Sequence, residues 1–233
     1  MIQRYPGEEL ELFARARHWK AYLQSELSPY LHGDVLEVGA GIGASTAAFC
    51  TDRVSRWLCL EPDPELAKQI HTRIETSELP ARCSVVCGTV QDLSECARFH
   101  AVTYVDVLEH ILEDAEELAS VARHLVPGGH LIVLSPAHPW LYSPFDAAVG
   151  HHRRYTKKSL ARVVPSGLEV VTLRYLDCAG LLASAANRVL LRRSVPTTGH
   201  IAFWDGALVP VSRQVDPLLG FRLGRSVLGI WTL

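Results

Sequence analysis

The chain has 233 residues, of which 48% are hydrophobic and 21% are charged, and its formal net charge at pH 7 is −2. This composition is typical of a globular domain with a full hydrophobic core, and it gives no reason to expect nucleic acid or an anionic membrane as a partner. Residues 1–7 lack the apolar segment of a secretory signal, and no stretch approaches the length of a membrane span. We therefore expect a cytoplasmic protein.

The cysteines argue against a disulfide framework and against a zinc site. None of the six forms a C-x-x-C pair, and no cluster of Cys and His has the spacing of metal ligands. Most of them lie within apolar strand or helix patterns. We expect reduced thiols in or near the core, and we expect no metal ion.

The hydrophobic pattern predicts helices and strands that alternate along the chain. An N-terminal amphipathic helix that ends near Ser28 carries on one face Leu12, Ala16, Trp19, Leu23 and Leu27. Strands are predicted at 35–38, 57–60, 83–87, 101–105, 130–134, 168–175 and 227–232, and a Pro-Gly-Gly turn at 127–129 is expected to stop the helix before the fifth strand. The alternation predicts an α/β fold, a seven-stranded and mostly parallel sheet with helices on both faces, whose ligand lies beyond the carboxyl ends of the strands.

The segment from Val35 to Gly43 is the most informative part of the chain. A short apolar run turns into Gly39, Gly41 and Gly43, and Glu37 lies two residues before the first glycine. Glycines between a strand and a helix let the backbone turn tightly and let a ligand lie against it. The spacing also fits a dinucleotide-binding turn, but a pyrophosphate would bring two negative charges toward the carboxylate. The acid therefore favours a cationic ligand without phosphate.

This strand, loop and acid resemble motif I of the class I S-adenosylmethionine-dependent methyltransferases, whose cofactor carries a sulfonium and an ammonium. The resemblance covers about residues 10–175 and includes the segment D-V-L-E-H-I at 106–111. It implies a Rossmann-like sheet, S-adenosyl-L-methionine as the methyl donor and S-adenosyl-L-homocysteine as the product. The cofactor-binding residues that it implies are Trp19, Glu37, Gly39, Gly41, Gly43, Glu61, Pro62, Thr89, Val90, Asp106 and Val107.

Several of these positions have a second interpretation. Glu61 at the end of the second predicted strand is suited to accept both ribose hydroxyls, but an acid at a helix start is common, and NAD also carries a ribose. Thr89 stands where the family's adenine-binding loop usually has an acid, and a plain turn capped by Asp92 is the alternative. His110 is a candidate base, although Glu109 and His110 open a helix and are expected to anchor it locally.

The segment 135–156 after the fifth predicted strand combines prolines, aromatic residues and polar groups, which is typical of a substrate site. It resembles a subgroup of bacterial methyltransferases with the pattern S-P-A-H-P-W, S-P-F-D and G-H-x-R-R-Y-T. His138 and His151 are the candidate catalytic bases, because imidazole accepts a proton near neutral pH. The candidate acceptor-binding residues are Trp140, Tyr142, Asp146, Arg153, Arg154 and Tyr155. Alternatively, Asp146 and the two arginines form a salt-bridged clamp that pins the loop.

We expect one methyltransferase domain over residues 1–233, with a helical cap at 1–30 and a helical insert at 177–225 before the last strand. Trp19 in the cap is expected either to close over the cofactor or to pack in the core. The insert is too apolar for a disordered linker, and we expect it to cap the acceptor site or to form a homodimer interface.

The predicted function is transfer of a methyl group from S-adenosyl-L-methionine to an oxygen or nitrogen of a small hydrophobic or anionic metabolite, with no nucleic acid or membrane partner. One alternative is an NAD-dependent oxidoreductase, because the glycine spacing fits it as well. Another is a non-catalytic S-adenosylmethionine-binding protein. The intact glycines, Glu37 and Glu61 argue against this last alternative, since they preserve the cofactor geometry.

Overall fold

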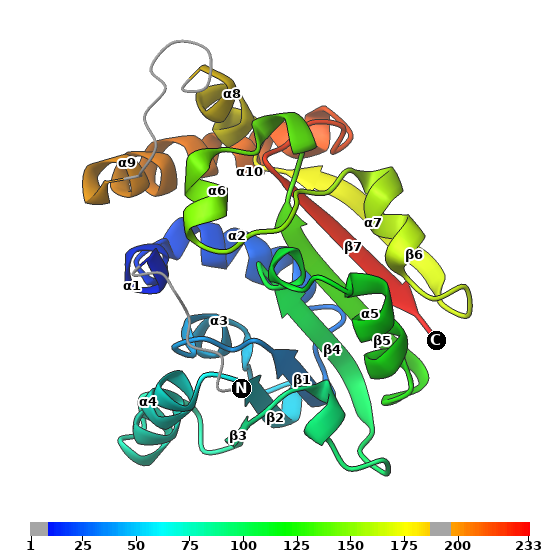
Figure 1. Ribbon diagram of the computed structural model, residues 1–233. Helices are drawn as coiled ribbons and strands as arrows, with labels where there is room; N and C mark the ends of the chain where they lie inside the picture. The colour runs from blue at the N-terminus through cyan, green and yellow to red at the C-terminus, as the bar shows by residue number, and fades with distance from the viewer. Residues whose placement is uncertain (1–8, 187–196) are drawn as a thin grey trace.

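The computed structural model describes residues 9–186 and 197–233. Within these residues, seven strands form one sheet in the order β3-β2-β1-β4-β5-β7-β6 (Figure 1). The strands are β1 (Gly33–Val38), β2 (Val54–Glu61), β3 (Cys83–Cys87), β4 (Phe99–Val105), β5 (Leu125–Pro136), β6 (Glu169–Leu176) and β7 (Ser226–Thr232). All neighbours are parallel except β7, which runs antiparallel to β5 and to β6. The predicted mostly parallel, Rossmann-like sheet is confirmed.

Helices cover both faces of this sheet and bury two clusters of hydrophobic side chains (Figure 1). The first cluster is covered by α2 (Arg17–Leu27), α3 (Ala44–Phe49) and α4 (Pro64–Glu75). The second is covered by α5 (Asp114–Ala122) and α7 (Lys157–Val163). Neighbouring residues of β1 point to opposite faces, so Val35 belongs to the first cluster and Leu36 to the second. Because the strands are buried on both faces, a ligand reaches the sheet at the strand ends.

The N-terminal segment forms two helices where the sequence predicts one, because α1 (Glu9–Ala14) ends before α2 begins. The ammonium of Lys20 donates to the carbonyl of Phe13, at 3.0 Å, near the end of α1. The carboxylate of Asp205 accepts from the backbone N–H of Trp19, at 2.8 Å, at the start of α2. These contacts satisfy backbone groups at both new helix ends, and one of them comes from a distant segment. The hydrophobic period alone does not reveal such a break.

Strand β5 also differs from its prediction, because it begins at Leu125 and contains the Pro-Gly-Gly segment 127–129. Helix α5 ends at Ala122, so these glycines do not cap it. Gly128 has a φ of +76°, and the register between β4 and β5 shifts after Phe99. The segment is therefore an irregularity inside the strand, where glycine adopts a conformation that other residues avoid.

Between β6 and β7 the described residues form helices that pack on the N-terminal segment. They are α8 (Cys178–Ala186), α9 (Thr198–Phe203), a π-helical turn (Trp204–Leu208) and α10 (Val209–Leu218). The buried carboxylate of Asp216 accepts from the hydroxyl of Tyr22, at 2.9 Å, and from the N–H of Asp177, at 2.7 Å. These bonds join α10 to α2 and to the end of β6. The expected boundaries of domain, cap and insert stay predictions.

Candidate functional site

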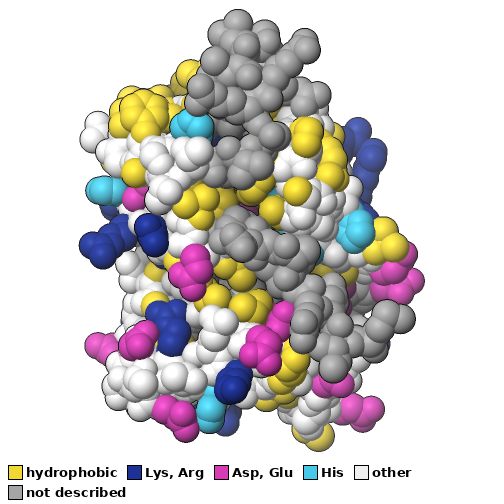
Figure 2. All heavy atoms as spheres, turned by 60° about the vertical axis from the view of Figure 1, so that its left-hand side comes forward, with side chains coloured by type: hydrophobic (Ala, Val, Ile, Leu, Met, Phe, Trp, Pro, Cys, Tyr) yellow, Lys and Arg dark blue, Asp and Glu magenta, His cyan; other side chains and the backbone are white. Residues whose placement is uncertain are grey.

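The carboxyl ends of β1, β2, β3 and β4 open into a cavity of about 1520 Å³. The loops after these strands form one wall, and α1, α2, α8, α9 and α6 (Pro144–Ala148) contribute to the other. Figure 2 shows hydrophobic side chains gathered between the upper and lower halves of this side of the molecule. A pocket for one small molecule typically has about 300–1000 Å³. The cavity therefore has room for two ligands side by side.

The glycine loop after β1 follows a path that favours glycine. Gly39 and Gly41 have φ values of +67° and +58° and line the cavity, whereas Gly43 lies outside it at the start of α3. A Cβ on Gly39 would lie 2.7 Å from a methyl group of Val107, closer than atoms pack. The N–H of Gly41 donates to Oε2 of Glu61 at 2.7 Å. The loop is thus held against the end of β2 with its backbone facing the cavity.

Glu61 and Pro62, to which the resemblance assigns cofactor binding, both line the cavity. Oε1 of Glu61 accepts from the N–H of Asp63 at 2.9 Å, in addition to the bond from Gly41 to Oε2. Burial raises the pKa of Glu61, and these two backbone donors oppose that effect. Each carboxylate oxygen has a second lone pair, so the group still has the capacity to accept ribose hydroxyls.

Thr89 and Val90 follow β3 and line the cavity together with Gln91. Oδ2 of Asp92 accepts from the N–H and the hydroxyl of Thr89, at 2.8 and 2.9 Å. The capped turn that the sequence left as an alternative is therefore present. Asp92 stabilises the turn, and Gln91 is a polar side chain of this loop that reaches the cavity wall.

Glu37 lies beneath the glycine loop and is not among the residues that line the cavity. Its Oε2 accepts from the hydroxyl of Thr46, at 2.5 Å, and from Nε1 of Trp57, at 2.8 Å. Burial raises the pKa of Glu37 to about 7, although both hydrogen bonds oppose the shift. The carboxylate thus joins α3 to β2. This position favours a role in supporting the loop over a direct contact with a cationic ligand.

Asp106 and Val107 follow β4 and line the cavity. Asp106 has a φ of +55°, which is unusual for a residue other than glycine and is often found at functional sites. The surrounding protein raises the pKa of Asp106 to about 6 by desolvation, against the opposing effect of Arg225 and His151. The group therefore presents a carboxylate to the cavity at neutral pH.

Asp146 on α6 organises the part of the cavity wall that follows β5. It is fully buried, and its Oδ1 pairs with Nε of Arg154 at 2.8 Å and with Nδ1 of His151 at 2.9 Å. Oδ2 accepts from the N–H and the hydroxyl of Ser143, at 2.8 and 2.7 Å. Although burial opposes it, these partners lower the pKa of Asp146 below its usual value. Asp146 and Arg154 both line the cavity, and they are two of the three residues of the salt-bridged clamp that was the alternative from the sequence.

The other predicted acceptor-binding residues lie outside the lining of the cavity. Arg153 pairs with Asp114 on α5 at 2.8 Å, and the hydroxyl of Tyr155 donates to the same carboxylate at 2.6 Å. The hydroxyl of Tyr142 donates to the carbonyl of residue 151 at 2.7 Å, and Trp140 is 50% exposed. These contacts fix the loop to the body of the fold.

The two candidate bases, His138 and His151, also differ in whether they line the cavity. Nε2 of His138 hydrogen-bonds the carbonyl of Gly224 at 3.0 Å, its ring lies 4.7 Å from that of Tyr175, and it does not line the cavity. His151 lines the cavity, and its bond to Asp146 through Nδ1 leaves Nε2 for other contacts. The geometry therefore favours His151 over His138.

Two further residues line the cavity: His110, which was expected to anchor its helix locally, and Arg225, which the sequence did not indicate. His110 does not only anchor its turn, because it lines the cavity with its ring 4.6 Å from that of His151. Burial lowers the pKa of His110 to about 4. Arg225 precedes β7, and its guanidinium lies 4.3 Å from the ring of Trp204 and 3.5 Å from Oδ2 of Asp177. These partners are far apart in the chain, so no local pattern predicts their meeting.

Comparisons with known proteins agree with this geometry. The family model described as a methyltransferase domain matches residues 35–129, which include the glycine loop and the ends of β2, β3 and β4. An uncharacterized 37.1 kDa protein in transposon TN4556 of Streptomyces fradiae is 26% identical over an alignment 204 residues long, and the alignment covers 78% of this chain. The chain spans 57% of the length of that relative.

Solved structures share the fold at low sequence identity. The Haloferax volcanii putative methyltransferase, in complex with the Trm112 methyltransferase activator, has a TM-score of 0.63 at 17% identity, and 99% of this chain and 98% of that chain are covered. The N-methyltransferase NodS from Bradyrhizobium japonicum, in complex with S-adenosyl-L-homocysteine, has a TM-score of 0.57 at 15% identity and 94% and 87% coverage.

None of the helices within the described residues has the length and apolar character needed to span a lipid bilayer. The matched residues include a glycine loop whose backbone faces a cavity at the strand ends. Residues 35–129 are thus similar to a methyltransferase domain, and the fold is that of S-adenosylmethionine-dependent methyltransferase structures.

Proposed function

We propose that the protein transfers a methyl group from S-adenosyl-L-methionine to an oxygen or nitrogen of a small, predominantly hydrophobic metabolite. The observation that carries this proposal is the continuity of one cavity from the glycine loop to His151. The volume of about 1520 Å³ accommodates a cofactor and an acceptor at once. Methyl transfer is an in-line displacement, which requires both ligands in one water-poor space.

The charge of the strand ends supports a cofactor without phosphate. Glu61 and Asp106 both line this part of the cavity, and their carboxylates would repel a pyrophosphate. Lys20 also lines it, but its ammonium donates to the carbonyl of Phe13 in α1. Two acids that reach the cavity, rather than the buried Glu37, therefore carry the negative charge that disfavours NAD.

The acceptor side is mostly apolar with a few polar groups. Hydrophobic side chains in its lining include Ile111, Leu141, Phe145, Val149, Ile201 and Phe203. Arg154 also lines it, but it is paired with Asp146, so less of its charge is available to an anionic acceptor. The balance favours a hydrophobic metabolite over a strongly anionic one.

His151 is the side chain that we assign to the acceptor's proton. Asp146 accepts from Nδ1, which directs Nε2 away from the carboxylate and orients the ring. A hydroxyl nucleophile needs such a base, whereas a neutral amine does not. The cofactor contacts that we propose are made by the backbone of Gly39 and Gly41 and by Glu61 and Asp106, with Trp19 in the opposite wall.

Two measurements test the proposal. Calorimetry is expected to show binding of S-adenosyl-L-homocysteine and none of NADH; the reverse result would make the protein an NAD-linked oxidoreductase. A panel of metabolite fractions incubated with methyl-labelled cofactor is then expected to yield labelled small molecules. Binding without transfer to any fraction would instead favour a non-catalytic binding protein.

A further inference from the structure

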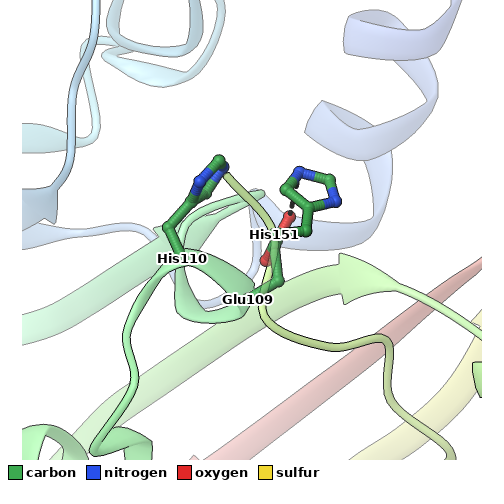
Figure 3. Close-up of side chains that lie close together, drawn as sticks. All are labelled: Glu109, His110 and His151. Carbon is green, nitrogen blue, oxygen red and sulfur yellow. Dashed lines mark ion pairs between the residues drawn. The ribbon is translucent and has the colours of Figure 1, made fainter. Parts of the chain in front are cut away.

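Three side chains with metal-ligand atoms meet in the cavity wall. Glu109 and His110 belong to a 3₁₀ turn (Leu108–His110) after β4, and His151 follows α6. One ligand atom from each lies within 4.8 Å of the other two, and Figure 3 shows the carboxylate and the two imidazole rings lying together. Two imidazoles and one carboxylate suit divalent first-row transition ions such as Zn²⁺ and Mn²⁺.

Glu109 gives an independent reason to expect a ligand here. The residue is 0% exposed, and within the described chain neither of its carboxylate oxygens has a hydrogen-bond partner. Nε2 of His151 lies 3.8 Å from Oε1, which is longer than a hydrogen bond. A buried carboxyl group without partners is unfavourable, and native proteins rarely keep one without a reason. A bound cation would supply the missing partner.

The contacts of His151 are those of a metal ligand. Its Nδ1 bonds to Asp146 at 2.9 Å, and Asp146 is held in turn by Arg154 and Ser143. A histidine that binds a metal usually donates its other ring N–H to a carboxylate, which fixes the ring and its tautomer. With Nδ1 used in this way, Nε2 is the nitrogen on the side of Glu109.

The charges around the cluster are compatible with a cation. Two guanidinium groups are near, but Arg154 pairs with Asp146 at 2.8 Å and Arg225 lies 3.5 Å from Asp177. Asp106 adds a further carboxylate whose charge acts on Glu109. Acidic groups therefore outnumber the arginines around the cluster.

We propose that Glu109, His110 and His151 bind one divalent first-row transition-metal ion. Metal bonds to nitrogen and oxygen of about 2.0–2.2 Å place the ligands of one ion roughly 3–4 Å apart, so the side chains need to move by about 1 Å. The sequence led us to expect no metal, because the ligands share no local spacing. They meet only because the turn after β4 packs against the segment after α6.

Resting on the methyltransferase function proposed above, the ion deepens the assignment of the acceptor. Three protein ligands leave coordination positions open toward the cavity. An acceptor hydroxyl occupies one of them, its pKa falls, and its proton leaves to solvent. The oxygen then attacks the methyl carbon, the carbon–sulfur bond breaks, and S-adenosyl-L-homocysteine forms. The ion takes the role assigned above to the free imidazole, and it favours a hydroxylated acceptor over an amine.

Titration of the EDTA-treated, dialysed protein with Mn²⁺, followed by calorimetry and by electron paramagnetic resonance, tests the proposal. Mn²⁺ is the first probe because Cys50 and Cys83, with sulfurs 3.5 Å apart, are a competing site for Zn²⁺. We expect one ion per chain, with affinity reduced at least about 10-fold in Glu109→Gln and in His110→Ala. His152→Ala, at an exposed neighbouring histidine, is the control and is expected to bind Mn²⁺ like the wild type.

Absence of Mn²⁺ and Zn²⁺ binding in a protein that binds S-adenosyl-L-homocysteine would overturn the metal site, as would unchanged binding in both variants. Circular dichroism shows whether each variant folds; if Glu109→Gln does not, His110→Ala decides. A protein that binds Mn²⁺ through Glu109 but does not bind S-adenosyl-L-homocysteine would keep the metal site and remove the proposed methyltransferase function. The two failures are therefore distinguishable.

Discussion

The two sides of the cavity are built in different ways. On the side that we propose for the cofactor, Glu61 ends β2, and the segments 39–41, 89–91 and 106–107 come from the loops after β1, β3 and β4. On the acceptor side, side chains from the turn after β4, from the segment after α6 and from the start of β7 meet through pairs such as Arg154–Asp146. Local strand–loop patterns determine the first side, and tertiary pairing determines the second.

This difference predicts how each side responds to substitution. A surface made of backbone tolerates most side-chain changes and fails where a Cβ cannot fit. A surface made of paired side chains loses its function when one member is removed, because the partner is left buried and unpaired. The following substitutions test this contrast, beginning with the largest expected effect.

His151→Ala is expected to lower kcat by about 10²- to 10⁴-fold, because the variant loses either the group that takes the acceptor's proton or a ligand of the ion that activates the hydroxyl. The affinity for S-adenosyl-L-homocysteine should change by less than about threefold, since His151 belongs to the acceptor side. Turnover with an acceptor from the metabolite panel, together with calorimetry, measures both quantities. His138→Ala is the matched control, because His138 bonds Gly224 outside the cavity lining. Equal losses in both variants would remove the distinction between the two histidines.

Gly39→Val is expected to weaken binding of S-adenosyl-L-homocysteine by about 10- to 100-fold, which corresponds to roughly 1–3 kcal/mol of strain. The new Cβ meets Val107 at 2.7 Å, at a φ of +67° that valine avoids. Gly128→Ala is the control that separates backbone strain from a steric clash. Gly128 has a φ of +76°, but a new Cβ there would have no atom within 4 Å. This control should lose stability without losing affinity. Equal affinity losses in both would mean that stability, not the loop's contact with the cofactor, governs binding.

The difference between the two sides of the cavity also explains which features of the protein could be predicted from the sequence. The parallel sheet, the glycine loop and the strand-end residues follow from local patterns of hydrophobicity and glycine, and Glu61 and Asp106 lie in the cavity lining, while their contact with the cofactor stays a prediction. The sequence shows that the segment 135–156 contains many polar and aromatic side chains, but it does not show which residues they pair with. Arg153 pairs with Asp114, for example, and only the packing of the loop on α5 brings them together.

Glu61→Gln is expected to weaken cofactor binding by about 10-fold, as the loss of one hydrogen bond to a charged group implies. The amide keeps one acceptor oxygen for Gly41 or Asp63, and the other backbone N–H loses its acceptor, so part of the loss is expected to come from the loop. Calorimetry with S-adenosyl-L-homocysteine measures the effect, and Glu65→Gln, at an exposed acid on α4, controls for general charge. An unchanged affinity in Glu61→Gln would contradict the ribose contact.

Glu37→Gln is expected to change affinity least, by less than about threefold, because the carboxylate bonds to Thr46 and Trp57 beneath the loop. Its effect should be on stability and should depend on pH. The pKa is raised from 4.5 to about 7 in the folded state, so between these values the folded protein keeps a proton that the unfolded chain has lost. Each pH unit in this window costs about 1.4 kcal/mol, so wild-type stability falls by up to about 3 kcal/mol as pH rises through it.

Glutamine does not ionise, and the variant should lack this contribution. Urea unfolding at several pH values between 4.5 and 8 measures the difference in free energy of unfolding between wild type and Glu37→Gln, which isolates Glu37 from the other buried acids. That difference should decline toward pH 7 and then level off. A difference that is constant with pH would mean that Glu37 ionises normally in the folded protein. An affinity loss of more than about 10-fold would instead support the direct contact between Glu37 and the cofactor that the resemblance implied. Part of the cofactor side would then depend on a side chain and not only on backbone.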